Sequence, residues 1–597
     1  MKKKLLSCLL AMSMVASLVA CGNEAAPTES KAPEASKEEA KVEETPVVEE
    51  VGESVVLDNG LDLGWVKPAE TIKLSVYAGE GDQTEFLADE VGGKGVMDAW
   101  LLENMNVEFD WQYMTGDMTE RLNLMLASGD YPAIITNMSD DMANKFIAQG
   151  KATDLTPYLD QMPNLTRRMG NYINMLKDEN GNLYKLATLW GENPNVAGYD
   201  FGVRYDYWLE LGEDKMYETP QEYIEVMKKI LANHPTNENG QKTYAFTSDN
   251  DGLSFLNAML AAYGFVTGYK VGADGSLVHW LNTEEGLEIA KLVNQMYRED
   301  LIDPDFQSVD YETYISKQSS GQVLGNFGTW WYAWVSGHQT WAVNEGDSYD
   351  INKRFANVSV HGEGVAMDET SLLTSNFLGS YRMIITDKAT EEEVAAIVKY
   401  LNWEASEVGT FIMGFGAPSE ANVWDVAADG TWLFDDAIMD VDLKDTTYHA
   451  VKDANATAYW VAINAQWLKD DEYADFTQID PRVDRVSVYD YWPVDPETGA
   501  FSNEGVNICW GNYTAPARDI SMYATSFDAN DPITTTKQII TDSINTAWTE
   551  IIMAESEEDC VAVFEATRDN CNAMGLEELT AYYAASYDKN VAKFEGK

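Results

Sequence analysis

The densest aromatic group in the chain consists of three tryptophans within five residues, Trp330, Trp331 and Trp334. Helical spacing would place Trp330 and Trp334 on one face. An indole has a flat apolar surface that fits the C–H face of a sugar ring, while nearby carboxylates and amides can hold the hydroxyl groups. Packing in a core is the alternative, but three tryptophans exceed what a core stripe needs. We therefore predict that at least one of these indoles contacts a ligand.

Trp190 and Glu192 form a second candidate for ligand binding. They follow Asn180-Gly181, a dipeptide that lies between extended segments and is typical of a β-hairpin. Trp190 offers the same flat ring surface, and the carboxylate of Glu192 can accept hydrogen bonds from hydroxyl groups. We predict that both residues contact the ligand.

Polar residues also follow segments that have the pattern of buried strands. Glu80 and Asp82 come after the first such segment, and Asn137 and Ser139 come after a later one. Loops at the carboxyl ends of parallel strands face the crevice in open α/β sheets, so these side chains can hydrogen-bond to a polar ligand. The alternative for each residue is that it caps a helix or faces water. We retain Glu80, Asp82 and Asn137 as candidate ligand-binding residues.

An early part of the chain alternates between the patterns of strands and helices. Apolar and polar residues alternate at 72–76 and 107–111, as in strands, and 133–136 is a short apolar run. A helical pattern at 118–128, and a weaker one at 85–102 that glycines interrupt, lie between them. This β-α-β-α-β order predicts an α/β fold with a parallel sheet and helices on both faces.

Two later segments have the apolar period of amphipathic helices. Thr219-Pro220 opens the first, because a threonine cap followed by proline is typical of a helix start. The second runs from Glu391 to Trp403. The predicted inward-facing residues are Tyr223, Val226, Met227, Ile230 and Leu231 in the first helix and Val394, Ile397, Val398 and Leu401 in the second.

The first twenty residues have the pattern of an export signal. Three lysines at 2–4 precede the apolar run 5–20, which is too short and wrongly flanked for a membrane span. Leu18-Val19-Ala20-Cys21 then resembles the lipobox of bacterial lipoproteins. In such proteins the signal peptide is cut before the cysteine, which carries lipid such as palmitate. We predict lipidation at Cys21, an ordinary signal peptide with a chance cysteine being the alternative.

The segment after Cys21 has the composition of a flexible tether. From Gly22 to about Ser54 it is rich in Glu, Ala, Pro, Lys and Ser and has no aromatic residue, so it cannot bury enough apolar surface to fold. We predict a lipidated tether over 21–68 that leaves the folded part outside the cell, anchored to the outer face of the cytoplasmic membrane. No other segment has about eighteen continuous apolar residues, so we predict no transmembrane helix.

The net charge of the chain and the absence of several catalytic motifs from its sequence limit the functions that the protein can have. The chain has 99 acidic and 41 basic residues, a net charge of -58, so it repels nucleic acid and anionic membranes. It has no Lys/Arg-rich block that would attract a polyanionic ligand. His-Glu-x-x-His, Gly-x-Ser-x-Gly and a Walker A loop are also missing from the sequence. We predict no enzymatic activity, although composition does not exclude a glycosidase pair of carboxylates.

Several stretches together resemble the family 1 extracellular solute-binding proteins, especially the long lipoprotein branch. The chain departs from the family pattern at Ala187 and Ala133, where proline and aspartate are usual. Some relatives have a Ca²⁺ loop at the position of 234–242, but here too few carboxylates alternate for an oxygen cage, so we predict no metal there. The stretches that carry the resemblance are 126–132 (LASGDYP), 180–186 (NGNLYKL), 203–212 (VRYDYWLELG), 219–223 (TPQEY), 301–306 (LIDPDF) with 321–334, and 574–587.

The resemblance implies a periplasmic-binding-protein-like fold of two discontinuous α/β lobes, with the ligand in the cleft between them. It places 69–190 and about 376–425 in the N-terminal lobe, and 191–375 and about 426–597 in the C-terminal lobe. Such proteins close on their ligand by hinge motion. Trp190 would lie near the hinge.

The resemblance also implies that the chain captures a carbohydrate and delivers it to the permease subunits of an ABC importer. With 18 Trp and 31 Tyr the chain is rich in aromatic residues, which favours an oligosaccharide ligand. We expect a monomer that needs no cofactor. Two alternatives stay open, a surface carbohydrate-active enzyme and a peptide-binding lipoprotein.

Overall fold

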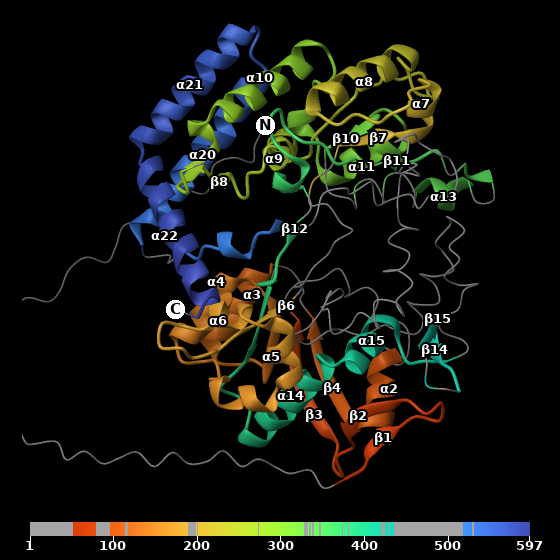
Figure 1. Cartoon of the computed structure of the whole chain (residues 1–597), viewed down its shortest axis with the longest axis vertical. Coiled ribbons are helices and arrows are strands. Elements are labelled where there is room, and N and C mark those ends of the chain that lie inside the picture. Colours follow the sequence, from red (N-terminus) through yellow and green to blue (C-terminus); the bar gives the residue numbers. More distant parts are fainter. Residues whose placement is uncertain are drawn as a thin grey trace, which may run out of the picture. The chain divides into compact units, whose positions relative to one another are not determined.

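The computed structural model describes most of the chain between residues 52 and 596 (Figure 1). These residues fall in one compact unit, Glu50–Lys597. The predicted leader and Cys21 lie outside the described residues. The described residues are 52–78, 96–113, 117–188, 199, 201–272, 274–327, 332, 336, 340–345, 348–350, 352–356, 358–372, 374–379, 381–419, 424–428, 430, 432–434, 518–527 and 531–596.

The N-terminal lobe is built on a five-stranded sheet in the order β4-β3-β5-β13-β6. β3 pairs in parallel with both β4 and β5, as the alternating strand and helix patterns predict. β13 comes from much later in the chain and runs antiparallel to β5 and β6. The strands are β3 (Ile72–Ala78), β4 (Val107–Tyr113), β5 (Ile134–Met138), β6 (Leu186–Thr188) and β13 (Tyr381–Ile385).

Helices cover both faces of this sheet. Successive strand residues point to opposite sides, so the apolar side chains on each side need a layer of helices to bury them. Ile134 and Ile135 of β5 belong to two separate cores. Leu122 of α3 and Phe146 of α4 pack with Ile135, whereas Ile397 of α14 packs with Ile134. The helices of this lobe are α2 (Val96–Met105), α3 (Met118–Ser128), α4 (Asp140–Ala148), η1 (Thr156–Gln161), α5 (Pro163–Met169), α6 (Tyr172–Leu176), α14 (Glu391–Glu404) and α15 (Glu407–Phe415).

Local capping explains why the predicted helices at 118–128 and 391–403 form where they do. Asp117 accepts a hydrogen bond from the backbone N–H of Glu120, and Gly129 ends α3 with a φ of 71°, which favours glycine. Thr390 and Glu393 form a reciprocal capping box at the start of α14. The predicted inward residues of α14 are all buried, so both helix predictions are confirmed.

The predicted tether over 21–68 is wrong at its C-terminal end. β1 (Ser54–Val56) and β2 (Asp62–Val66) form an antiparallel hairpin. Leu63 and Trp65 of this hairpin are buried in the core that also holds Ile134, and the Trp65 indole N–H donates to the last carbonyl of α2 at 2.9 Å. The prediction extended the polar composition of residues 22–54 too far along the chain. The residues that follow include alternating apolar side chains, and the burial of these side chains holds the hairpin against the core.

The C-terminal lobe has a smaller antiparallel sheet in the order β10-β7-β11 and a large helical core. The predicted helix after Thr219 is confirmed as α8, with Tyr223, Met227 and Ile230 buried and Leu231 partly buried. The elements are β7 (Gly202–Arg204), β8 (Tyr269–Val271), β9 (Leu277–His279), β10 (Gly325–Asn326), β11 (Phe355–Ala356), α7 (Tyr205–Glu210), α8 (Pro220–Asn233), α9 (Leu253–Ala262), η2 (Trp280–Asn282), α10 (Glu284–Arg298), η3 (Phe306–Ser308), α11 (Tyr311–Ser319), α13 (Thr340–Glu345), η6 (Met367–Glu369), α20 (Pro532–Ile552) and α21 (Glu557–Ala573).

The last helix, α22 (Leu576–Phe594), contacts the cores of both lobes. Leu576 and Leu579 at its start are buried in the C-terminal core, whereas Phe594 at its end packs on Tyr172 of the N-terminal lobe, with ring centroids 4.8 Å apart. The remaining elements are β12 (Thr374–Ser375), which pairs in parallel with β16 (Arg518–Asp519), the hairpin of β14 (Trp424–Val426) and β15 (Trp432–Phe434), and η8 (Ser521–Tyr523).

The predicted lobe boundaries stay a proposal. Two segments that were assigned to the C-terminal lobe contact the N-terminal core. Val426 and Trp432 pack against the N-terminal core, as Phe594 does, although the resemblance assigned residues from about 426 to the C-terminal lobe. The chain therefore returns to the N-terminal lobe more often than the two predicted ranges indicate.

We predict that Trp65→Ala lowers the free energy of unfolding by about 3–5 kcal/mol, because it opens a cavity in the N-terminal core. Urea unfolding followed by circular dichroism measures the change. Val56→Ala in the same hairpin is the control, because Val56 is 58% exposed, and we expect it to shift stability by less than about 0.5 kcal/mol. Equal effects of the two variants would contradict the placement of the hairpin in the core.

Candidate functional site

The structure describes one of the eight predicted ligand-binding residues, Asn137. Tyr332, in the middle of the predicted tryptophan cluster, is also described. The other predicted residues stay predictions because they lie outside the described residues. They are Glu80, Asp82, Trp190, Glu192, Trp330, Trp331 and Trp334.

Asn137 lies at the carboxyl edge of the N-terminal sheet, near the end of β5. Its φ of 53° is in the left-handed region, which asparagine tolerates better than most residues. Its side-chain oxygen accepts a hydrogen bond from the Thr188 hydroxyl at 2.9 Å, which links β5 to the end of β6. Ser139 caps α4 by accepting from the backbone N–H of Met142, so the helix-cap alternative holds for Ser139. Asn137 thus fixes the edge that a ligand would approach.

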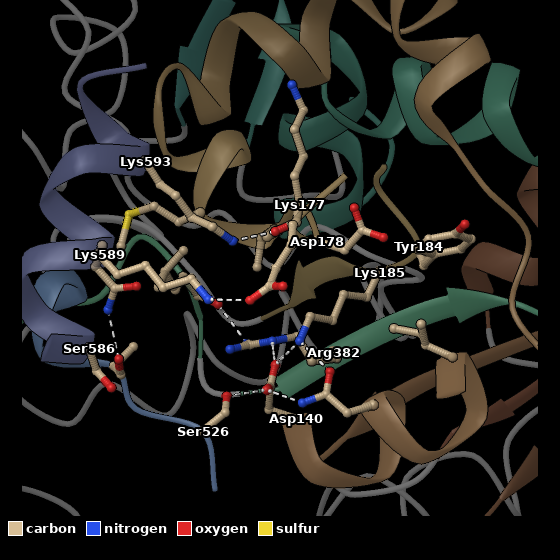
Figure 2. Close-up of a pocket in the computed structure, with 18 of the residues that line it drawn as sticks. Asp140, Lys177, Asp178, Tyr184, Lys185, Arg382, Ser526, Ser586, Lys589 and Lys593 are labelled. Carbon is tan, nitrogen blue, oxygen red and sulfur yellow. Dashed lines mark hydrogen bonds and ion pairs between the residues drawn. The ribbon is translucent and has the colours of Figure 1, made fainter. Parts of the chain in front are cut away.

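Asp140 joins four segments at the same edge, as Figure 2 shows. Its carboxylate pairs with Lys185 at 2.6 Å and with the Nε of Arg382 at 2.5 Å. It also accepts hydrogen bonds from the amide of Asn144 at 2.9 Å and from the hydroxyl of Ser526 at 3.0 Å. Burial alone would raise the pKa of Asp140, but Lys185 and Arg382 outweigh it and hold the pKa well below its usual value.

The C-terminal lobe has its own carboxyl edge of parallel backbone segments. Tyr244 bridges in parallel to Val323, and Phe246 bridges in parallel to Ile302. The residues that follow these segments therefore meet at one edge. They include Thr247 to Asp249, Asp303 and, beyond β10, Tyr332.

Buried polar side chains are held in place at this edge. Asp303 is only 1% exposed, and its carboxylate pairs with the ammonium of Lys317. The Thr247 hydroxyl donates to the same carboxylate at 3.2 Å. A buried charge needs such partners, so this group is a rigid support for the edge.

A tyrosine cluster, Tyr311, Tyr314 and Tyr332, lies beside this support. The ring centroid of Tyr332 is 5.3 Å from that of Tyr311 and 4.9 Å from that of Tyr314. The Tyr332 hydroxyl donates to the carboxylate of Asp249 at 2.7 Å. Burial, together with the Asp249 carboxylate, raises the pKa of Tyr332. Tyr311 is 38% exposed, so part of the cluster faces solvent.

This cluster combines flat apolar rings with a fixed carboxylate, which is the chemistry that sequence analysis expected of a sugar site. It lies next in sequence to Trp330 and Trp331. Asp249, Tyr311 and Tyr314 were not among the residues predicted from the sequence. The spacing of Tyr311 and Tyr314 on one helical face was the only signal that could have pointed to them.

The structure describes no grouping of three or more His, Cys, Asp or Glu that could hold a metal ion. At the loop where some relatives bind Ca²⁺, the side-chain oxygen of Asn237 accepts from the backbone N–H groups of Asn239 and Gln241 at 3.0 and 2.9 Å. Asn237 therefore closes this loop on itself. Within the same described residues, no helix is long and apolar enough to cross a bilayer.

Comparison with known proteins identifies the fold. The structure of FusA from S. pneumoniae in complex with kestose superimposes with a TM-score of 0.58 over 87% of this chain and 99% of that chain, at 17% identity. The chain has the fold of a two-lobed extracellular solute-binding protein. A solute-binding protein from Bifidobacterium longum infantis that binds human milk oligosaccharides (HMO) gives a TM-score of 0.55 at 16% identity, over 87% and 99% of the two chains. The predicted α/β fold with two lobes is confirmed.

The sequence comparison points to the same relative. The fructooligosaccharide ABC transporter substrate-binding protein FusA of Streptococcus pneumoniae serotype 4 is 25% identical over 299 residues. This match covers 46% of the chain and 54% of FusA, so it spans about half the length of the relative. No protein-family model matches the chain. The predicted resemblance to extracellular solute-binding proteins is confirmed at the level of the fold.

We predict that Asp140→Asn lowers the free energy of unfolding at pH 7 by about 1–3 kcal/mol, because Lys185 and Arg382 lose their charged partner. A carboxylate with a lowered folded pKa stabilises the protein above its unfolded pKa of about 3.9 and loses this effect as the pH falls below it. The difference between wild type and variant should therefore shrink below about pH 4. Urea unfolding of both proteins across about pH 2.5–7 measures this difference. The range extends from about 1.5 pH units below the unfolded pKa of the aspartate to about 3 units above it.

Asp141→Asn is the control for this prediction, because Asp141 lies in the same helical turn and is exposed. It removes the same charge without breaking the contacts of Asp140. If Asp141→Asn destabilised the protein as much as Asp140→Asn, the effect would come from the start of α4 and not from the ion pairs.

Proposed function

We propose that the chain is an extracellular substrate-binding protein that captures an oligosaccharide and delivers it to an ABC importer. The observation that carries this proposal is that two independent comparisons, one of sequence and one of structure, lead to the same protein, FusA. That relative is named for fructooligosaccharides and has been solved with kestose. We therefore propose a small oligosaccharide as the first ligand to test.

The two carboxyl edges support a binding site of this kind. Asn137 and Thr188 fix one edge, and Tyr332 with Asp249 fixes the other. In the proposed function, the tyrosine cluster and the adjacent tryptophans stack on sugar rings, while carboxylates such as Asp249 accept hydrogen bonds from hydroxyl groups. Closure of the lobes around the sugar would exclude water from these contacts.

The proposal includes the place of the protein in the cell and its partners. The leader and Cys21 support export and attachment to the outer face of the cytoplasmic membrane by lipid. The bound sugar would pass to the permease subunits of the importer. We propose that the protein acts as a monomer, without cofactor or catalysis.

Calorimetric titration of the chain from residue 22 against an oligosaccharide panel tests this function. The panel includes kestose, longer fructooligosaccharides, milk oligosaccharides and short peptides. We expect tight binding of one oligosaccharide class, with the sugar recovered intact. Released products would instead indicate a carbohydrate-active enzyme, and binding of peptides alone would indicate a peptide-binding lipoprotein.

We predict that Trp330→Ala weakens binding of that sugar about tenfold or more, because loss of ring stacking costs about 1.4 kcal/mol. Tyr297→Ala is the matched control, an aromatic residue of α10 in the same lobe that packs on Phe306 outside the tyrosine cluster. It should leave the affinity unchanged within about twofold, which is below 0.5 kcal/mol. Unchanged affinity in Trp330→Ala would remove this tryptophan from the proposed site.

We predict that Cys21→Ser releases the protein from the membrane, because serine lacks the thiol to which lipid attaches. Fractionation of producing cells, with labelled palmitate as the lipid precursor, measures the location and the label. Cys560→Ser is the control, since Cys560 is buried in the folded part and should leave both unchanged. A Cys21→Ser protein that stayed on the membrane would overturn the lipid anchor.

A further inference from the structure

A cavity of about 350 Å³ lies where the N-terminal lobe meets the C-terminal segment (Figure 2). On one side the residues come from α4, the 177–185 loop and β13. On the other side they come from the segment after η8 and from α22. It is separate from the tyrosine cluster, none of whose residues line it.

The charge of this cavity is opposite to that of the chain. Five of its residues are basic and three are acidic, whereas the whole chain has 41 basic and 99 acidic residues. The basic residues come from separate parts of the sequence, so no Lys/Arg-rich block signals them. They are Lys177, Lys185, Arg382, Lys589 and Lys593, and the acidic ones are Asp140, Asp178 and Glu179.

The three carboxylates are already engaged. Asp140 is held by Lys185 and Arg382, as described above. The Asp178 carboxylate accepts the backbone N–H groups of Asn180 and Asn182, at 2.8 and 2.9 Å. Glu179 has a side chain that is 83% exposed, and it pairs with Lys589 at 3.1 Å on the rim. Asp178 and Glu179 still act on Lys593 through their charges, but neither forms an ion pair with it.

One ammonium group of the cavity, that of Lys593, has only a neutral oxygen partner. It donates to the backbone carbonyl oxygen of Lys177, whose own side chain points away from Lys593 (Figure 2) and donates to the side-chain oxygen of Asn174 at 3.0 Å. Lys593 forms no ion pair with any residue that the structure describes. Burial first, and then the nearby charges of Lys589 and Lys185, lower the pKa of Lys593. An anion in the cavity would relieve this repulsion.

We propose that this cavity is a second binding site, for a small anion that carries a carboxylate or phosphate group. Lys593 would bind the anion directly, with Lys589 and Lys185 beside it. A volume of about 350 Å³ corresponds to about twelve water molecules, which suits a small solute and excludes a long oligosaccharide. The site bridges the N-terminal lobe and α22, and it does not rest on the proposed sugar site.

Thermal unfolding and calorimetric titration of the chain from residue 22 test this proposal. The probes are inorganic phosphate and glucuronate, each compared with sodium chloride at equal ionic strength. We expect phosphate, glucuronate or both to raise the unfolding temperature in a concentration-dependent way, and the two arms distinguish the phosphate from the carboxylate source. No rise beyond that in sodium chloride for either probe would overturn the proposal.

Variants of the cavity locate the binding. Lys593→Gln with Lys589→Gln should weaken binding about tenfold or more, because charge-assisted hydrogen bonds are lost. Lys593→Arg keeps the charge and should retain binding, which separates loss of the site from loss of the fold. Lys229→Gln is the surface control, because Lys229 pairs with Glu213 away from the cavity. Equal affinity in wild type and the double glutamine variant would show that the anion binds elsewhere and would contradict the proposed site.

Discussion

One carboxylate, that of Asp140, ties together segments that are far apart in the sequence. Its partners lie 45, 242 and 386 residues away, in Lys185, Arg382 and Ser526. A half-buried charge of this kind is stable only when its partners stay in place, because the loss of either cation removes part of the charge that compensates it. Asp140 therefore helps to hold the 177–185 loop, β13 and the segment leading to the final helices in place, beside the backbone pairing of β13 with β5 and β6.

Both candidate binding edges place polar groups at the ends of parallel backbone segments, but the two lobes hold these segments in different ways. In the N-terminal lobe, β3 and β5 run in parallel and the antiparallel β13 closes the edge behind them. In the C-terminal lobe, isolated parallel bridges take the place of long strands, and buried Asp303 with Lys317 supplies the rigidity. In both arrangements polar groups lie where strands end, and the residues around these groups determine which ligand binds.

Local patterns in the sequence predicted the strands at 72–76 and 107–111 and the helices that have caps, such as α3 and α14. These elements depend on neighbours in the chain, which sequence periodicity records. The hairpin at 54–66 was missed because its burial depends on Trp403 and on α2, far along the chain. Asp140 and the tyrosine cluster were missed for the same reason, since a pattern of spacing does not show which distant residues meet.

The place of β13 in the sheet sets an order for assembly. Among the strands that the structure describes, β6 pairs only with β13, which is made almost two hundred residues later. The first part of the chain therefore cannot complete its sheet while residues beyond 380 are still being synthesised or threaded through a membrane. Until then, the open edge of β5 and the unpaired segment of β6 stay available to other chains. Early folding intermediates thus depend on protection from aggregation until the middle of the chain arrives.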